Sequence, residues 1–196
     1  MTLGLATDVV AASPPMPNPA LLTRALRTFE SLDRAGRVRN RLLTVIDYSL
    51  PSSERRLWVV DPRTSEVLFH EFVAHGRGSA DPSNPDLAVR FGNAPSSKRT
   101  SLGTFLTGDT YTGEHGHSLE LDGLERGVND LARRRRIVIH PADYVGAEFR
   151  RRSGGRVGRS FGCPALDPSV AVKLIDRIRG GSVIVAAAED RALARR

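Results

Sequence analysis

Three short apolar runs, separated by tight turns, constrain the fold of this chain most strongly. The runs are rich in Val, Ile, Leu, Phe and Trp, and they span Leu42–Tyr48, Arg56–Asp61 and Glu66–Ala74. Pro51-Ser52-Ser53 and Asp61-Pro62-Arg63-Thr64 lie between them, and both have the composition of turns. Parallel strands need crossovers of about a dozen residues or more, and these gaps are shorter. The pattern therefore predicts an antiparallel meander.

Periodic segments elsewhere add helices at the edges of this β-rich body. Helical spacing of apolar residues predicts helices over Pro19–Ala35, after an Asn18 N-cap, and over Pro168–Arg179. Further segments predict a helix over Leu124–Arg135 and strands over Thr104–Thr107, Ile137–His140 and Ser182–Ala187. Gly76–Ser97, with its prolines and glycines, predicts a long irregular loop that faces a substrate. The predicted fold class is mainly β with flanking helices (α+β).

The chain length of 196 residues favours one domain with terminal extensions. We expect a flexible N-terminal segment at 1–18, which we interpret as a remnant of an export signal or a linker, although no basic residues precede its short apolar run. The domain itself is expected at 19–188, with a frayed tail at 189–196. No stretch reaches the ~18 apolar residues of a membrane span, so an integral membrane segment is not expected.

Basic charge is concentrated in the second half of the chain. Lys and Arg number 29 against 22 Asp and Glu, and arginines cluster at Arg133–Arg136 and Arg150–Arg152, with Arg156 and Arg159 nearby. Such clusters attract anionic polymers, either nucleic acid or a cell-wall polymer that carries carboxylates. Aromatic residues make up only 6% and no RRM, KH or zinc-finger signature is present, so a solvated basic face is favoured over a nucleic-acid partner.

Cys163, the single cysteine, is the best candidate for a nucleophile. It lies in Gly158-Arg159-Ser160-Phe161-Gly162-Cys163-Pro164, and one cysteine excludes an intramolecular disulfide. A glycine before the thiol lets the backbone turn tightly and aim N–H groups at one point, while nearby cations favour the thiolate. A buried packing role is the alternative. The letters of a serine-hydrolase elbow occur at Gly158–Gly162, but the chain lacks the alternating α/β pattern of that fold.

A thiol nucleophile needs a base, and His140 is the best placed of five histidines. It closes the apolar strand Ile137-Val138-Ile139, upstream of Cys163, where a rigid scaffold mounts the side chain. A structural histidine at a strand end is the alternative. His115-Gly116-His117 offers a weaker alternative as two metal ligands without a third, and His70 and His75 are expected to be structural. No phosphate-binding fingerprint is present.

These motifs together resemble one family, the murein L,D-transpeptidase (YkuD-like) catalytic domains, over about residues 20 to 187. The resemblance rests on Ile139-His140 followed by Ser160-Phe161-Gly162-Cys163 and on Ser101-Leu102-Gly103-Thr104-Phe105. Val73-Ala74-His75-Gly76 and Leu121-Asp122-Gly123 are also similar. The chain looks most like the branch with an aromatic, here Phe161, in place of the second motif histidine. Pro164 and a long His-to-Cys loop depart from the common pattern and leave substrate and acceptor choice open.

The resemblance implies a β-rich catalytic domain that joins peptidoglycan stem peptides through a thioester and forms 3,3 cross-links without cofactor or metal. By position, Cys163 would be the nucleophile, His140 the base and the Pro141 carbonyl its orienter, with N–H groups around Gly162 and Cys163 forming the oxyanion hole. Substrate contacts are expected from Arg159, Ser160, Tyr111 and His117. The alternatives are an L,D-carboxypeptidase or envelope-targeting toxin with the same chemistry, a non-catalytic peptidoglycan-binding protein, and a nucleic-acid binder. The substrate implies a periplasmic or cell-envelope location, and the oligomeric state stays open.

Overall fold

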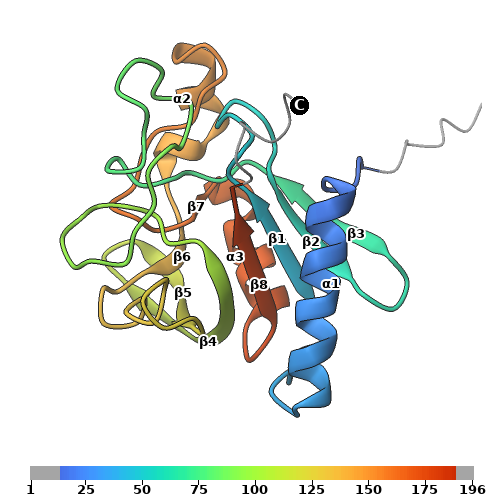
Figure 1. Cartoon of the computed structure of the whole chain (residues 1–196). Helices are drawn as coiled ribbons and strands as arrows, with labels where there is room; N and C mark the ends of the chain where they lie inside the picture. The colour runs from blue at the N-terminus through green and yellow to red at the C-terminus, as the bar shows by residue number, and fades with distance from the viewer. Residues whose placement is uncertain (1–13, 189–196) are drawn as a thin grey trace, which may run out of the picture.

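A computed structural model describes residues 14–188 of the protein (Figure 1). Most of the predicted N-terminal segment (residues 1–13) and the predicted tail (189–196) lie outside the described residues. Within residues 14–188, no helix is long and apolar enough to cross a membrane.

One mixed sheet organises the described part of the chain, with strand order β3-β2-β1-β8-β4-β5-β6-β7. The strands are β1 (Leu43–Asp47), β2 (Leu57–Asp61), β3 (Glu66–Glu71), β4 (Gly103–Gly113), β5 (Gly116–Gly123), β6 (Val138–Pro141), β7 (Ala165–Leu166) and β8 (Val183–Ala187). The helices are α1 (Pro19–Arg34), α2 (Ala147–Arg152) and α3 (Pro168–Ile178), with a 3-10 turn, η1 (Asp143–Val145). The predicted antiparallel meander is confirmed as β1–β2–β3, and the fold is mainly β with flanking helices.

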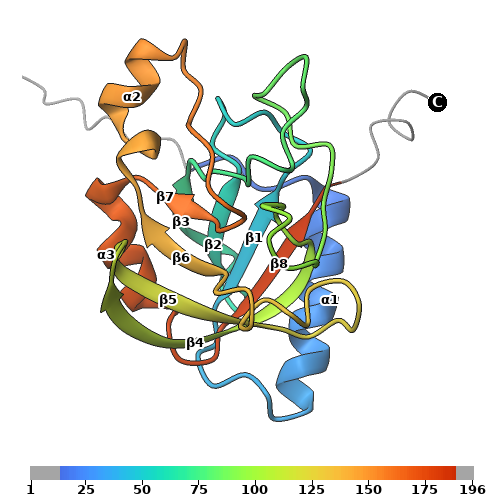
Figure 2. The same ribbon diagram turned by 90° about the vertical axis from the view of Figure 1, so that its left-hand side faces the viewer.

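The two central strands are buried on both faces because helices cover both sides. Leu43 and Val45 of β1 pack with α1, whereas Leu42 and Ile46 belong to the core that contains α3. β8 pairs with β1 in parallel and alternates in the same way. Figure 2 shows β4, β5 and β6 curving around α3 on the side opposite α1. The curved strands therefore bring β6, which carries His140, over α3.

The helix predicted over Leu124–Arg135 is wrong: residues 125–136 form a series of turns. The cause is the buried side chain of Asn129, which makes hydrogen bonds that compete with a regular helix. Its Oδ1 accepts from the Glu125 N–H at 2.8 Å, and its Nδ2 donates to the carbonyls of Leu102 at 3.0 Å and Thr104 at 2.9 Å. These bonds tie the segment to the start of β4.

The β4–β5 hairpin is longer than the sequence indicates. The strand predicted over Thr104–Thr107 is only the first part of β4, and β5 (Gly116–Gly123) was not expected. β5 contains Gly, His, Glu and Asp and no β-branched residue, so its propensity for a strand is weak. Pairing on both sides, with β4 and β6, holds it in the sheet. This hairpin extends to the end of β6, beside the candidate site.

The packing predicts a sharp contrast between two substitutions on α3. Leu174 is fully buried and Val172 is 49% exposed, although they are only two residues apart on the same helix. We expect Leu174→Ala to lower the free energy of unfolding by about 2–5 kcal/mol, because it leaves a cavity in the core. Val172→Ala should change it by no more than about 0.5 kcal/mol. Urea denaturation of both variants measures this, and equal losses would contradict the packing of α3.

Candidate active site

The Cys163 thiol lies on the backbone of β6, the strand that carries His140. The short parallel pairing of β6 with β7 places His140 opposite Ala165, so the chain just before β7 runs beside Val138. The thiol Sγ lies 3.7 Å from the carbonyl oxygen of Arg136, and the Val138 N–H donates a hydrogen bond to it. Val138 and His140 are two positions apart on the strand, so their side chains point to the same face. Pairing of β6 with β7 thus places Cys163 beside the strand that carries His140.

Ser160 fixes the loop that carries the thiol. Its hydroxyl donates to the Cys163 carbonyl at 2.6 Å and accepts from the Gly162 N–H at 3.0 Å, and the residue is almost fully buried. The Ser160 side chain is therefore bound within the loop, and its expected contact with substrate stays a prediction. The Gly162 N–H also has a partner, the Ser160 hydroxyl, and the oxyanion hole expected around Gly162 and Cys163 stays a prediction. Within residues 14–188, the Cys163 N–H makes no hydrogen bond to a protein acceptor, and the same holds for the Phe161 N–H of this loop.

A second glycine allows the Cys163 loop to lie against the chain at residues 75–77. A Cβ added at Gly76 would lie 2.3 Å from the Lys98 carbonyl oxygen and 2.9 Å from Gly162 Cα, both closer than real Cβ contacts. The Ser160 N–H donates to the His75 carbonyl at 3.0 Å, across this contact. Gly162 itself has φ +127°, a conformation that favours glycine. Both glycines are therefore required by the backbone geometry around the thiol.

The His140 ring is oriented by the carbonyl of the next residue. Its Nδ1 lies 2.8 Å from the Pro141 oxygen, the contact that the family resemblance implied, so Nδ1 carries the proton and Nε2 presents a lone pair. The imidazole is 4% exposed, and this burial lowers its pKa. The hydrogen bond to Pro141 raises the pKa, whereas the neighbouring His115 ring lowers it. His140 is thus held as a neutral imidazole that can accept a proton.

The electrostatics of the thiol differ from the sequence prediction. Nearby cations were expected to favour the thiolate, but burial dominates and raises the pKa of Cys163. The Val138 N–H and the Arg135 guanidinium act in the opposite direction and lower it. Arg135 donates to the carbonyls of Gly92 and Arg99 and to the Ser101 hydroxyl, so neutral groups hold its charge near the thiol. A neutral thiol beside a neutral imidazole is the resting state.

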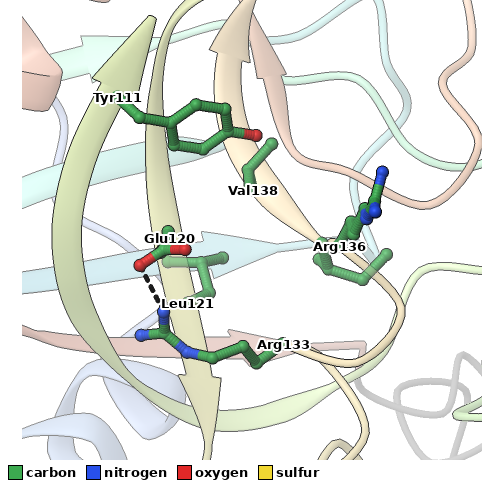
Figure 3. A pocket seen from close by; sticks show the side chains of 7 residues that line it. Tyr111, Glu120, Leu121, Arg133, Arg136 and Val138 are labelled. Carbon is green, nitrogen blue, oxygen red and sulfur yellow. Dashed lines mark hydrogen bonds and ion pairs between the residues drawn. The ribbon is translucent and has the colours of Figure 1, made fainter. Parts of the chain in front are cut away.

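Two hollows border the line from Cys163 to His140. The larger is a cleft of about 680 Å³ on the His140 side. Its lining includes Arg77, His115, His140, Tyr144, Arg159 and Phe161. The smaller, of about 240 Å³, has Val138 and Arg136 in its wall, the two residues whose backbones contact the thiol. In Figure 3 the Tyr111 ring reaches across this hollow toward Val138, with the ion pair of Glu120 and Arg133 below it.

The predicted substrate residues are divided among different places. Arg159 lies in the larger cleft with His140, where it also donates to the Pro85 carbonyl at 3.0 Å. Tyr111 lines the smaller hollow and is 44% exposed. His117 lines neither, and its Nε2 lies 3.0 Å from an Asp176 carboxylate oxygen on α3.

Other groups at the site were missed in the sequence, namely His115, Arg135, Arg77 and Tyr144. His115 was considered only as a metal ligand, and it stacks on His140 with 4.5 Å between ring centroids. Among residues 14–188, no three His, Cys, Asp or Glu side chains come together as a metal site. The contacts of these groups are long-range, so no local motif indicates them.

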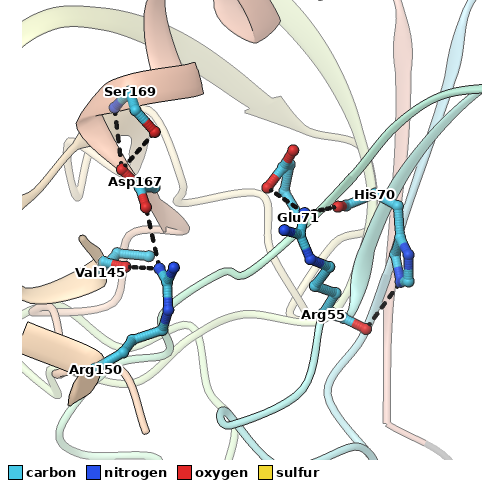
Figure 4. Close-up of polar contacts among 7 residues, drawn as sticks. All are labelled: Arg55, His70, Glu71, Val145, Arg150, Asp167 and Ser169. Atoms are coloured by element: carbon cyan, nitrogen blue, oxygen red, sulfur yellow. Dashed lines mark hydrogen bonds and ion pairs between the residues drawn. The ribbon is translucent and has the colours of Figure 1, made fainter. Parts of the chain in front are cut away.

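Acidic partners neutralise much of the arginine clusters. Figure 4 shows Arg150 between the Val145 carbonyl and Asp167, whose carboxylate also caps α3 through Ser169. In the same view, Arg55 joins the carbonyl of His70 and the carboxylate of Glu71. Arg133 pairs with Asp122 and Glu120, and Arg151 and Arg152 pair with Glu148. Arg150 thus links the η1 turn to the start of α3, and Arg133 links the segment before β6 to β5.

The fold and the site define a β-rich domain with a thiol and an imidazole on one face of its sheet. The family model for the L,D-transpeptidase catalytic domain matches residues 15–186. The chain belongs to this family, which confirms the resemblance identified in the sequence.

Solved structures of low sequence identity resemble the chain. An L,D-transpeptidase from Mycobacterium smegmatis is 18% identical, with a TM-score of 0.43 over 76% of this chain and 59% of that one. L,D-transpeptidase 1 from Mycobacterium tuberculosis is 15% identical, with a TM-score of 0.40 over 75% and 61%. An L,D-transpeptidase from Xylanimonas cellulosilytica is 15% identical, with a TM-score of 0.42 over 81% and 68%. The chain spans about three fifths of the length of the first two. No curated protein matches it.

The charge of Arg135 lowers the pKa of the Cys163 thiol, so substitution of Arg135 should change it. Arg135→Gln should raise the pKa of Cys163 further, because it removes the cation that stabilises the thiolate. The rate of alkylation by iodoacetamide, followed against pH, reports this as a curve displaced to higher pH. Arg135→Lys keeps the charge and should stay closer to the wild type, and the exposed Arg134 supplies a matched control, Arg134→Gln. Equal displacement in the Lys and Gln variants would contradict an effect of charge.

Proposed function

We propose that this protein is a cysteine-dependent L,D-transpeptidase that joins peptidoglycan stem peptides through a thioester acyl-enzyme and forms 3,3 cross-links. One observation carries the proposal: the Cys163 thiol lies on the strand that mounts His140, and the Pro141 carbonyl holds the His140 ring with Nε2 free. Family membership supports an acyltransferase-type enzyme. We further propose that the protein acts in the periplasm or cell envelope, where such a substrate is found.

Acylation begins from the neutral pair. His140 Nε2 takes the proton of the Cys163 thiol as the sulfur attacks the carbonyl carbon of the third stem residue, a diaminopimelate. The C–S bond forms and the carbonyl becomes a tetrahedral oxyanion, toward which the unpartnered Cys163 N–H can donate. The C–N bond to the terminal D-alanine then breaks, and the leaving amine takes the proton from His140. A thioester and free D-alanine result.

The second half reverses the proton path with a new nucleophile. The side-chain amine of a second stem gives a proton to His140 as it attacks the thioester carbonyl. The C–S bond breaks, an amide forms between the two stems, and the sulfur regains its proton from His140. No metal, nucleotide or other cofactor takes part. Water in place of the amine gives an L,D-carboxypeptidase, and the openness of the larger cleft to solvent favours this as the second candidate.

The two hollows suit the two substrates. The larger cleft has two guanidinium groups, from Arg77 and Arg159, which match the terminal carboxylate of a donor stem. The smaller hollow adjoins the thiol from the other side and offers the Tyr111 ring and the Glu120 carboxylate to an amine-bearing acceptor. Transfer at the thiol requires a donor stem in the larger cleft and an acceptor stem in the smaller hollow. The presence of two hollows supports transfer to an amine.

Mass spectrometry of products from tetrapeptide muropeptides tests the proposal. The wild type should yield a dimer that lacks one D-alanine, and Cys163→Ala should yield none, because the attacking sulfur is gone. His140→Gln should slow the reaction by about 10²–10⁴-fold, the range of a lost general base.

His70→Gln is the matched control, because His70 stacks on Trp58 at β2–β3 and should leave the rate unchanged. Tripeptide monomer as the only product would replace the transpeptidase with a carboxypeptidase or a toxin that trims stems. No product from folded wild-type protein would refute catalysis and leave a peptidoglycan-binding protein.

A further inference from the structure

The imidazole of His115 lies face to face with that of His140. The ring centroids are 4.5 Å apart and the planes differ by 26°. His115 is exposed at the tip of the β4–β5 hairpin, whereas His140 is buried at the end of β6. His115 therefore covers one face of the His140 ring, and the Pro141 carbonyl holds its edge.

Two further contacts fix the hairpin tip at this place. A Cβ added at Gly116 would lie 3.5 Å from Pro141 Cγ, so the backbone of the tip lies against the residue that orients His140. The next residue, His117, reaches α3 and places its Nε2 3.0 Å from Asp176. Gly116 has φ +76°, which the tight turn between β4 and β5 requires. The stacking thus belongs to a docked hairpin, in which the two residues after His115 contact Pro141 and α3.

We propose that His115 is a positioning residue for His140: its ring packs on the imidazole and holds it in the orientation that lets it act as a base. This inference rests on the proposed function, in which His140 transfers protons. Two imidazolium rings in contact repel each other, so a proton on His115 disfavours one on His140.

Other titratable and charged groups also face the cleft beside His140. They come from the loop after β3, the β4–β5 turn, the η1 segment and the loop before β7: Arg77, Glu114, Asp143, Tyr144 and Arg159. The two arginines disfavour a proton on His140, and the two carboxylates favour one. His115 alone among the groups in the cleft stacks on the His140 ring. His115 is therefore the neighbour whose removal changes both the position and the charge around His140.

Histidine NMR titration of three variants tests the inference without substrate. In His115→Gln, which removes ring and charge, the pKa of His140 should rise and the acid limb of the kcat/KM profile should move to higher pH. In His115→Phe, which keeps a ring without a charge, the pKa should rise as well. The plateau kcat of His115→Gln should fall by about tenfold, less than the ~10²-fold of a 1 Å misplacement, and that of His115→Phe should fall less.

His70→Gln is the control, and it should leave the His140 titration unchanged. An unchanged titration in His115→Gln would overturn the inference, as would the same rise in His70→Gln. Equal plateau kcat in the wild type and His115→Gln would overturn the positioning role. If the wild type forms no product but the titration shifts as expected, the proposed function fails while the inference about His115 stands.

Discussion

The site depends on the close approach of two backbone segments, at Gly76 and Gly162. No side chain fits between them, because a Cβ at Gly76 would lie within 3 Å of the Gly162 backbone. The Ser160 loop can therefore lie along residues 75–77, and its hydrogen bonds then direct Cys163 toward β6. Without this contact, the thiol would not reach the strand that carries His140. Local backbone geometry at two glycines thus decides where the thiol lies.

Burial, rather than the net charge of the protein, sets the protonation of the reacting groups. It raises the pKa of Cys163 and lowers that of His140, so neither is charged at rest. Arg135 opposes this for the thiol, and the Pro141 carbonyl opposes it for the imidazole. A neutral thiol resists oxidation and attacks only when His140 accepts its proton. In the proposed mechanism, the Cys163 thiol therefore gives its proton to His140 when substrate binds. No thiolate–imidazolium ion pair exists before that step.

Local patterns in the sequence were sufficient for much of the fold and for naming two candidate site residues, whose roles stay predictions. Apolar runs with short turns gave the β1–β3 meander, and strand-end and glycine motifs gave His140 and Cys163. The predictions that failed depend on contacts between residues that are far apart in the chain. The segment 124–135 has helical spacing, but the side chain of Asn129 bonds to the start of β4. The raised pKa of the Cys163 thiol and the stacking of His115 on His140 likewise arise from residues far apart in the chain, which no local motif encodes.

Intact-protein mass spectrometry after brief mixing with a tetrapeptide stem tests the central claim most directly. The account predicts a covalent adduct whose mass is that of the stem less D-alanine, on the peptide that contains Cys163, released by hydroxylamine as a thioester is. Cys163→Ala should carry none. An adduct on another residue, or cross-linked product formed by the Cys163→Ala variant, would contradict a thioester at Cys163.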